Sequence, residues 1–407
     1  MANALPEDIG RLGSAIEASF KSASIGTIVN HGALVQLDPK EARASLPRPI
    51  LRNSEKDGFA DLPGAQSYDL TMEHLVTDLC KAQYGDWIET SMGEKVTAGT
   101  LESFSSGTNS TTTKSGSTET YDAIIRVPAD DGNSYHVPLK TKTSTVATFA
   151  YLLPASAAAN AKSKNASETG GAHYADKKDG TVNTFQLQTD QSDFAGETWV
   201  KGQGAVPVSP FKLVYTPNGL LKLQWAWKAA TWTLSTSAGG SGLADATENT
   251  EDYVSDVISF GIQSLASAAV LTALRPKALS LSCGYGFDPR MGGQGISGST
   301  VPGSFISGWN RRNSATERIT ATIDDGDWKT WDDLRAAKTA LFFWAEFQPG
   351  TPSSSAGASR LCIFKPQVKV VSATPVKVDG QKCTALELMV ERRASWRREY
   401  VSLFGTS

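Results

Sequence analysis

The stretch from residue 277 to residue 347 limits the possible folds of this chain more than any other part. It begins with a strand-like run, Leu279–Phe287, and continues into a loop of almost thirty residues that is rich in Gly, Ser, Pro and Arg. Apolar and polar side chains then alternate, which is the period-two pattern of a half-buried strand. The apolar members are Ile319, Ala321 and Ile323. The stretch therefore predicts two strands joined by an unusually long loop.

A short helix and a third strand complete this stretch. Thr330 and Asp333 have the spacing of a capping box, in which the Thr oxygen accepts a backbone N–H and the carboxylate bonds back to the start of the helix. The apolar run Leu341–Ala345 has the composition of a buried strand. We therefore expect the order strand, long loop, strand, helix, strand.

The same order occurs earlier in the chain. Thr27–Leu37 predicts one or two strands, residues 38–66 form a loop that contains four prolines, and alternation resumes over Tyr68–Met72. Leu75–Ala82 then predicts a short helix. Few residues are identical between the two stretches, but the order and the lengths agree, which indicates an internal duplication.

Composition favours β structure with long polar loops. The chain has 407 residues, enough for two or three domains, and its net charge of −3 with 20% charged residues does not favour nucleic-acid or membrane affinity. The four cysteines are widely spaced, as expected for reduced structural thiols. The acidic N-terminus lacks a signal-peptide pattern. The apolar run Val254–Leu274 is interrupted by polar residues, so we expect a helix there rather than a membrane span.

Other segments carry simpler signals. Leu5, Ile9, Leu12, Ile16 and Phe20 fall on one helical face, so residues 5–20 predict an amphipathic helix that packs on its own domain or on a neighbouring subunit. Two Ser/Thr/Gly/Ala-rich segments, 105–120 and 155–181, predict exposed loops.

Two hairpins have clear turn signals. Alternating apolar residues flank Pro217-Asn-Gly219 and predict one hairpin, whose second strand contains Trp225 and Trp227. A second hairpin is predicted across Asp379-Gly380, between Leu361–Val371 and Thr384–Val390. The alternating Trp residues could form a sugar-binding platform, but packing in the core is the favoured interpretation.

Catalytic and cofactor patterns are weak. Gly293–Gly298 matches the bare dinucleotide-binding pattern, but Pro302 follows where a helix would have to run. Asp324–Asp327 resembles part of a calcium loop without its terminal Glu, and a turn before a helix explains it better. The four histidines lack metal-ligand or nucleophile spacing. We predict no enzyme activity, no cofactor and no metal.

Two basic clusters lie beside tryptophans, an arrangement that could bind nucleic acid. They are Arg311-Arg312 beside Trp309, and Arg392-Arg393 with Arg397-Arg398 beside Trp396. The acids close to them in sequence are Glu317, Glu391 and Glu399. We therefore favour ion pairs between subunits or a solvated face.

Three parts of the chain together carry a resemblance to a known family. The first is a long Arg/Gly-containing loop followed by an alternating strand and a short helix, at Pro47–Leu79 and again at Gly303–Arg335. The second is the strand, glycine break and paired strands of residues 184–223, and the third is the closing pattern Leu386–Val390 with Glu399–Phe404. In these features the chain resembles the major tail tube proteins of long-tailed bacteriophages, in the larger form with a duplicated module.

The resemblance implies a mainly β fold with two tandem tail-tube-type β-sandwich or barrel modules. Each module would have a short flanking α-helix and a long stacking loop, at 38–66 and 288–316. Residues 1–25 would form a helical arm, 26–200 the first module with Ser/Thr-rich loop insertions, and 201–407 the second module. Candidate contacts between rings or subunits are Arg48, Arg52, Phe59, Trp309, Arg311, Arg312, Arg397 and Arg398.

The function that follows from the resemblance is structural. The chain would assemble with itself into a trimeric ring with pseudo-sixfold symmetry, and the rings would stack into a tube in the virion tail. DNA and the tape measure protein would pass through the lumen, and tail terminator and distal tail proteins would bind the ends. The protein would be made in the host cytoplasm and would contact no membrane. The alternatives are a carbohydrate-binding or adhesion β-sandwich, and another virion component such as a tail terminator.

Overall fold

The structure is a computed structural model of the chain. It describes residues 12–22, 25–31, 34–46, 62–76, 80–96, 102–114, 123–142, 146–158, 162–165, 172–190, 199–217, 219–235, 253–265, 269–272, 274–291, 306–312, 317–349 and 360–404. Within these ranges the chain is mainly β, with large antiparallel sheets and two helices, which confirms the predicted fold class. Neither of these two helices is long and apolar enough to cross a lipid bilayer.

Eight strands are joined edge to edge in one antiparallel sheet. In spatial order they are β3 (Leu34–Leu46), β4 (Leu62–Leu75), β16 (Lys222–Ala229), β15 (Phe211–Tyr215), β19 (Pro276–Cys283), β22 (Arg318–Ile323), β25 (Gln381–Val390) and β24 (Arg360–Val378). The first four strands come from residues 34–229 and the last four from residues 276–390. β15 pairs with β19 where the two groups meet.

Two further groups of strands pack their apolar faces into the same core. The first group, in spatial order, is β2 (Val29–Asn30), β1 (Leu12–Ile16), β13 (Phe185–Asp190), β14 (Trp199–Pro207) and β17 (Thr231–Ser235). The second is β18 (Tyr253–Gln263), β23 (Leu341–Pro349), the first half of β24, β26 (Tyr400–Phe404), β12 (Ala172–Asp176) and β5 (Gly93–Val96).

The same succession of strand pairings occurs twice. In the first set, the pairings are β1–β13, β13–β14, β14–β17, β15–β16, β16–β4 and β4–β3. In the second set, the corresponding pairings, in the same order, are β18–β23, β23–β24, β24–β26, β24–β25, β25–β22 and β22–β19. β24 is one continuous strand that belongs both to the eight-stranded sheet and to the second group of strands. In the first half of the chain, the corresponding places are taken by two separate strands, β15 in the sheet and β14 in the first group. Because residue 200 lies inside β14, a division there would cut a strand. The first set of these pairings ends with β17 and the second begins with β18, while the division of the chain into two modules stays a prediction.

The two helices occupy equivalent places but begin elsewhere than predicted. α1 (Cys80–Met92) follows β4, which continues through Leu75, so the helix predicted at 75–82 begins too early. α2 (Trp328–Ala336) follows β22, and its N-cap is Asp327, whose carboxylate accepts the Thr330 N–H. The predicted capping box therefore lies one turn too late. The correct cap satisfies the first free N–H groups of the helix.

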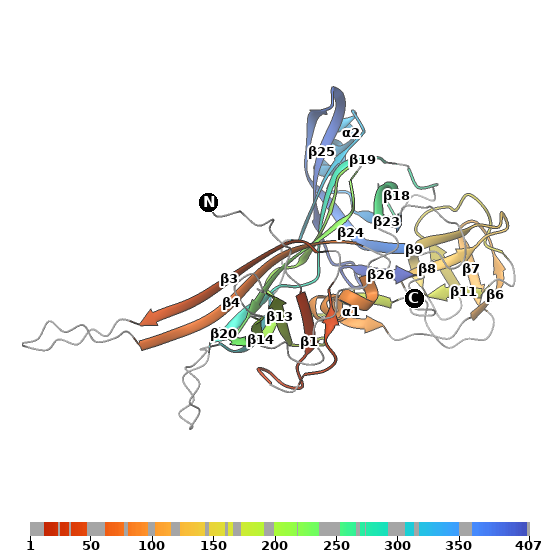
Figure 1. Cartoon of the computed structure of the whole chain (residues 1–407). Helices are drawn as coiled ribbons and strands as arrows, with labels where there is room; N and C mark the ends of the chain where they lie inside the picture. The colour runs from red at the N-terminus through yellow and green to blue at the C-terminus, as the bar shows by residue number, and fades with distance from the viewer. Residues whose placement is uncertain are drawn as a thin grey trace, which may run out of the picture.

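Both long loops are hairpins in their described parts. β3 and β4 pair from Leu34 and His74 out to Leu46 and Leu62, and Figure 1 shows this hairpin projecting far from the body. β20 (Phe287–Met291) and β21 (Ile306–Arg311) form the second, shorter hairpin. Residues 47–61 and 292–305 lie outside the described part of the chain.

The segments predicted as Ser/Thr-rich loops contain strands. A closed barrel contains β6 (Glu102–Gly107), β7 (Thr111–Lys114), β8 (Ile124–Pro128), β9 (Ser134–Lys142), β10 (Val146–Phe149) and β11 (Lys162–Asn165). It is inserted between β5 and β12, and its core merges with side chains of β23, β24 and β26 (Figure 1). The loop predictions at 105–120 and 155–181 are thus wrong for β6, β7, β11 and β12. A polar composition misled them, because hydroxyl side chains fit a paired strand well.

Two predicted helices are strands where the structure describes them. Residues 12–16 form β1, which pairs with β13 on one side and β2 on the other. Leu12 to Ala15 are all buried, so apolar spacing alone could not distinguish a central strand from a helix. Residues 253–263 form β18, paired along β23. The predicted helices over 5–20 and 254–274 are therefore wrong there, and residues 1–11 are not described.

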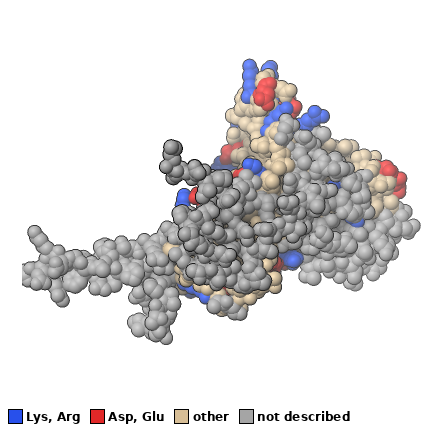
Figure 2. All heavy atoms as spheres, viewed as in Figure 1, with Lys and Arg blue, Asp and Glu red and all other residues tan. Residues whose placement is uncertain are grey.

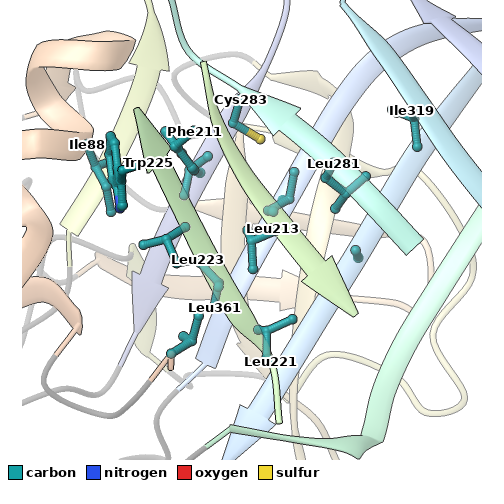
Figure 3. Close-up of a cluster of buried hydrophobic side chains, with 14 of the residues drawn as sticks. Ile88, Phe211, Leu213, Leu221, Leu223, Trp225, Leu281, Cys283, Ile319 and Leu361 are labelled. Carbon is teal, nitrogen blue, oxygen red and sulfur yellow. The ribbon is translucent and has the colours of Figure 1, made fainter. Parts of the chain in front are cut away.

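The two predicted hairpins are confirmed. β15 pairs with β16 across the Asn-Gly turn, and β24 pairs with β25 across Asp379-Gly380, both of which have positive φ. Trp225 and Trp227 are each only 1% exposed. Figure 3 shows Trp225 beside Ile88 of α1, in the core that the facing strands share. Core packing is therefore correct, and a sugar-binding platform at these residues is excluded.

Candidate assembly surfaces

The hairpin β20–β21 is predicted to carry contacts to other subunits, and two of its basic residues, Arg311 and Arg312, bind within the chain. Arg311 donates to the backbone carbonyl oxygens of Thr90, Lys177, Lys178 and Thr181, at 2.6 to 2.9 Å. Its guanidinium also stacks over two aromatic rings, those of Tyr285 and Phe287. Burial lowers the pKa of Arg311. Arg311 therefore fastens the base of the hairpin to the end of α1 and to the turn after β12.

The neighbours of Arg311 are also engaged within the chain. Trp309 donates its indole N–H to the Gly204 carbonyl oxygen at 2.8 Å. Arg312 pairs with Asp288 across the hairpin at 2.5 Å. The Trp309 bond joins the hairpin to β14, whereas the Arg312 pair joins the two ends of the hairpin to each other.

The second basic cluster binds two different parts of its own chain. Arg397 donates to Glu94 at 2.8 Å, which ties the segment before β26 to β5. Arg398 donates to Glu317 at 2.9 Å and stacks over Tyr285. Both of these ion pairs lie within the chain, while contacts of Arg397 and Arg398 with other subunits stay a prediction. Arg48, Arg52 and Phe59 lie outside the described residues.

A buried charge network lies behind Arg398, and its lysine was not among the predicted residues. Lys365 of β24 has no exposed surface, and its ammonium lies 2.5 Å from Glu399 and 3.6 Å from Glu317. Burial alone would lower the pKa of Lys365, but the neighbouring Cys283 and then these carboxylates outweigh it and raise that pKa. Glu399 also accepts the Gly284 N–H at 2.7 Å. The network joins β24 to the ends of β19 and β22 beside it, so it fixes strand positions rather than offering a reactive group.

Histidines and acids form no metal site among the described residues. His31 and His74 lie in an aromatic cluster with Trp87, where the His31 ring accepts from or donates to Ser14 at 2.7 Å. Burial, and then the proximity of His74, lower the pKa of His31 well below its ordinary value. The glycine pattern Gly293–Gly298 is outside the described residues, so the structure does not test it.

The surfaces best built for binding are the two ends of the eight-stranded sheet. β3 pairs only with β4, among the strands that the structure describes. At the other end, β24 pairs with β23 and β26 over its first half, up to Val368, and with β25 over Val368–Val378. Within the described part of the chain, residues 369–378 thus have a strand on one side only. An open strand edge presents unpaired N–H and C=O groups that pair readily with another strand.

The interior of the sheet shows what such a pairing looks like. Among the strands of the eight-stranded sheet from residues 34–229, β15 corresponds to the second half of β24. Among those from residues 276–390, β19 corresponds to β3. β15 and β19 pair over five residues, from Phe211–Cys283 to Tyr215–Leu279. No protein-family model matches the chain, and no curated protein is significantly similar to it.

Proposed function

We propose that the chain is a structural subunit of a bacteriophage tail tube, which assembles with copies of itself into stacked rings and has no enzyme activity. The observation that carries the proposal is the eight-stranded sheet. It consists of two groups with the same pairings, joined internally by β15 and β19. Among the described strands, β3 and residues 369–378 of β24 each have a strand on one side only, and α2 also packs against β24. A chain built in this way can repeat its internal joint with the next copy.

The joint between copies would pair residues 369–378 of one β24 with β3 of the next copy. The geometry of this pairing would follow that of β15 with β19, because the strands occupy equivalent places. Continuing the sheet through every copy closes it into a ring and removes both open edges, which are otherwise sites of aggregation. Two modules per chain would give three chains a pseudo-sixfold ring.

One proline on each edge limits how these edges can pair. Pro39 lies in β3 and Pro375 in the one-sided part of β24. A proline lacks an N–H, so each edge loses one donor and cannot support an uninterrupted ladder. The prolines therefore disfavour pairing in arbitrary registers with unrelated strands. The two edges can still pair in a register in which each proline faces a residue that makes no hydrogen bond between the strands.

The hairpin β3–β4 provides a route to a second ring. It extends well beyond the body in Figure 1. The hairpin β20–β21 lies in the connection between β19 and β22, which are the strands that correspond to β3 and β4. In a stack of rings these hairpins would contact the neighbouring ring. The lumen would carry DNA and the tape measure protein, while tail terminator and distal tail proteins would cap the ends of the tube in the virion.

The rival assignment to a carbohydrate-binding module has lost its support, because Trp225 and Trp227 are in the core. Negative-stain electron microscopy of the purified chain tests the proposal. We expect threefold rings or hollow tubes. A stable monomer at high concentration, or closed particles without a lumen, would contradict the proposal.

A matched pair of variants tests the edge itself. Lys377 is exposed and lies two residues before the Asp379-Gly380 turn. In a two-residue hairpin, Val378 and Gln381 are the hydrogen-bonded pair, so the Lys377 N–H points to the open edge. Lys377→Pro should leave the β24–β25 ladder intact and prevent assembly, whereas Lys377→Ala should assemble normally. Tubes formed equally by both variants would exclude this edge as the contact.

A further inference from the structure

The barrel of β6 to β11 is held on the rest of the protein by side chains rather than by strand pairing. None of its described strands pairs with a described strand of the surrounding sheets, and the two parts share one isolated backbone bridge, Leu152–Val270, within the described residues. Apolar side chains of the barrel and of β23, β24 and β26 form one buried cluster. The barrel can therefore leave the sheets without breaking a ladder of hydrogen bonds.

A polar contact is buried where the barrel meets the sheets. His136 of β9 is 3% exposed, and its Nδ1 atom lies 3.0 Å from the Oε1 atom of Glu346 in β23. Arg360, at the start of β24, donates from its Nε atom to the same oxygen at 3.0 Å. Because the carboxylate accepts both hydrogen bonds, neutral His136 carries its proton on Nδ1. The contact therefore uses the neutral imidazole as a donor.

The second ring nitrogen of His136 offers no favourable place for a proton. Its Nε2 atom is buried, and among the described residues no acceptor lies within hydrogen-bonding distance of it. The ring of Phe404 in β26 packs against the imidazole, with the ring centroids 4.5 Å apart. A second proton would therefore create a buried charged N–H that nothing accepts, and such a group is costly in a protein interior.

The charged groups around the ring only partly offset this cost. Burial lowers the pKa of His136 and outweighs Glu346, which raises it. Arg360 and Arg126 act in the same direction as burial, and Arg126 lies opposite His136 in the pairing of β8 with β9. Tyr151 donates its hydroxyl to the His136 carbonyl oxygen at 3.0 Å, and burial raises its pKa well above 10. Among these groups, His136 is therefore the one poised to gain a proton in mild acid.

Other acidic groups of the barrel lie on its surface. Asp130 and Asp131, in the turn between β8 and β9, are exposed. Figure 2 shows acidic side chains at the outer end of the barrel. Exposed carboxylates exchange protons with water where they stand, so their titration does not require the barrel to move. His136 differs from them because it is enclosed between the barrel and the sheets.

We propose that the His136 contact fastens the barrel at neutral pH and loosens it in mildly acidic solution. A proton on Nε2 can be hydrated only after the barrel moves away from β26, so the open arrangement binds a proton more readily than the closed one. The contribution of neutral His136 to docking is therefore complete above pH 6.5 and is lost as pH falls below that value. The inference concerns a single chain and does not depend on the proposed tube.

The thiol of Cys362 in β24 reports this opening. Cys362 has no exposed surface and lies in the cluster that the barrel shares with the sheets. Cys383 of β25 is also buried but lies outside that cluster, so it serves as an internal reference. The full chain is treated at low concentration with a pyridyl disulfide, and mass spectrometry compares the labelling rates of the two thiols. Their ratio cancels the pH dependence of reactivity that both thiols share.

Between about pH 7.5 and about pH 5.5 we expect the labelling of Cys362 relative to Cys383 to rise about tenfold, since the open form gains a proton with a pKa near 6.5. His136→Gln keeps a donor for Glu346 but cannot titrate, so its ratio should change less than about twofold. His31→Phe removes another buried imidazole and should respond as the wild type does. A ratio that stays constant in the wild type, or that rises equally in His136→Gln, would overturn the inference.

A measurement on the wild type covers the case in which His136→Gln does not fold. Deuterium exchange of the carbon-bound ring proton at Cε1, followed by mass spectrometry, gives the pKa and the accessibility of each histidine. His136 should exchange more slowly than in the urea-unfolded chain, with a midpoint below 6.5. A midpoint at or above that value would overturn the inference, because docking of the barrel would then not exclude the proton.

Discussion

At the scale of single residues, Lys365 shows how a charge is accommodated in the core. Its ammonium contacts Glu399 and Glu317 and donates to the Ser282 carbonyl oxygen at 2.8 Å. Lys365→Met keeps most of the volume but removes the ammonium from between two buried carboxylates, of which Glu317 keeps its pair with Arg398. We expect it to lower the free energy of unfolding by about 3–5 kcal/mol in urea denaturation. Lys369→Met removes a partly exposed partner of Glu391 and should cost less than about 1 kcal/mol. Equal losses would contradict the role assigned to the network.

A second residue-scale prediction concerns pH. His31 is buried, and burial together with His74 holds its folded pKa well below the ordinary 6.5. The unfolded chain therefore binds a proton more readily. The stability contributed by neutral His31 is complete above pH 6.5 and is lost as pH falls below that value. The free energy of unfolding should fall between about pH 7.5 and about pH 5.5, and less so in His31→Phe. Identical pH profiles would contradict this.

Residue patterns in the sequence foretold some of these sites but not others. Alternation placed Trp225 and Trp227 on one face of a strand, and burial of that face followed. The role of Arg311 could not be foretold, because its carbonyl partners at Thr90, Lys177, Lys178 and Thr181 are distant in sequence. A charged residue beside a tryptophan looks the same whether it faces solvent, a partner or its own backbone.

At the scale of elements, strands with short-range signals were predictable and buried strands were not. The hairpin across Asp379-Gly380 has alternation and a turn dipeptide within one window. β1 is buried on both faces, and its partners β13 and β2 follow at very different distances in the chain. The barrel strands β6 and β7 have no apolar period at all. Their pairing depends on neighbours that a local pattern does not show.

The turn between β24 and β25 offers a matched glycine test. Gly380 has a φ of 78°, and a Cβ there would meet no atom within 4 Å, so only backbone strain opposes a side chain. Gly380→Ala should lower the free energy of unfolding by about 1–2 kcal/mol, because L-residues disfavour the left-handed region. At Gly308 there is equally open space without a left-handed φ. Gly308→Ala should be nearly neutral, and equal losses in thermal or urea unfolding would contradict this explanation.

At the scale of the whole molecule, the sequence predicts a duplication from its recurring order of strand, long loop, strand and helix, and the structure has two similar successions of strand pairings. That both arise from one duplicated module stays a prediction. The sequence could not give the joint between β15 and β19, since that pairing links residues about seventy positions apart. Nor could it show that the ends of the sheet are open.

The central claim is that residues 369–378 of β24 and strand β3 pair between copies. Hydrogen–deuterium exchange of assembled and dissociated protein measures this pairing directly. We predict that backbone amides in both segments become protected on assembly, while the β15–β19 joint, already paired, changes little. Assembled particles in which both edges exchange as freely as in the dissociated chain would contradict the account.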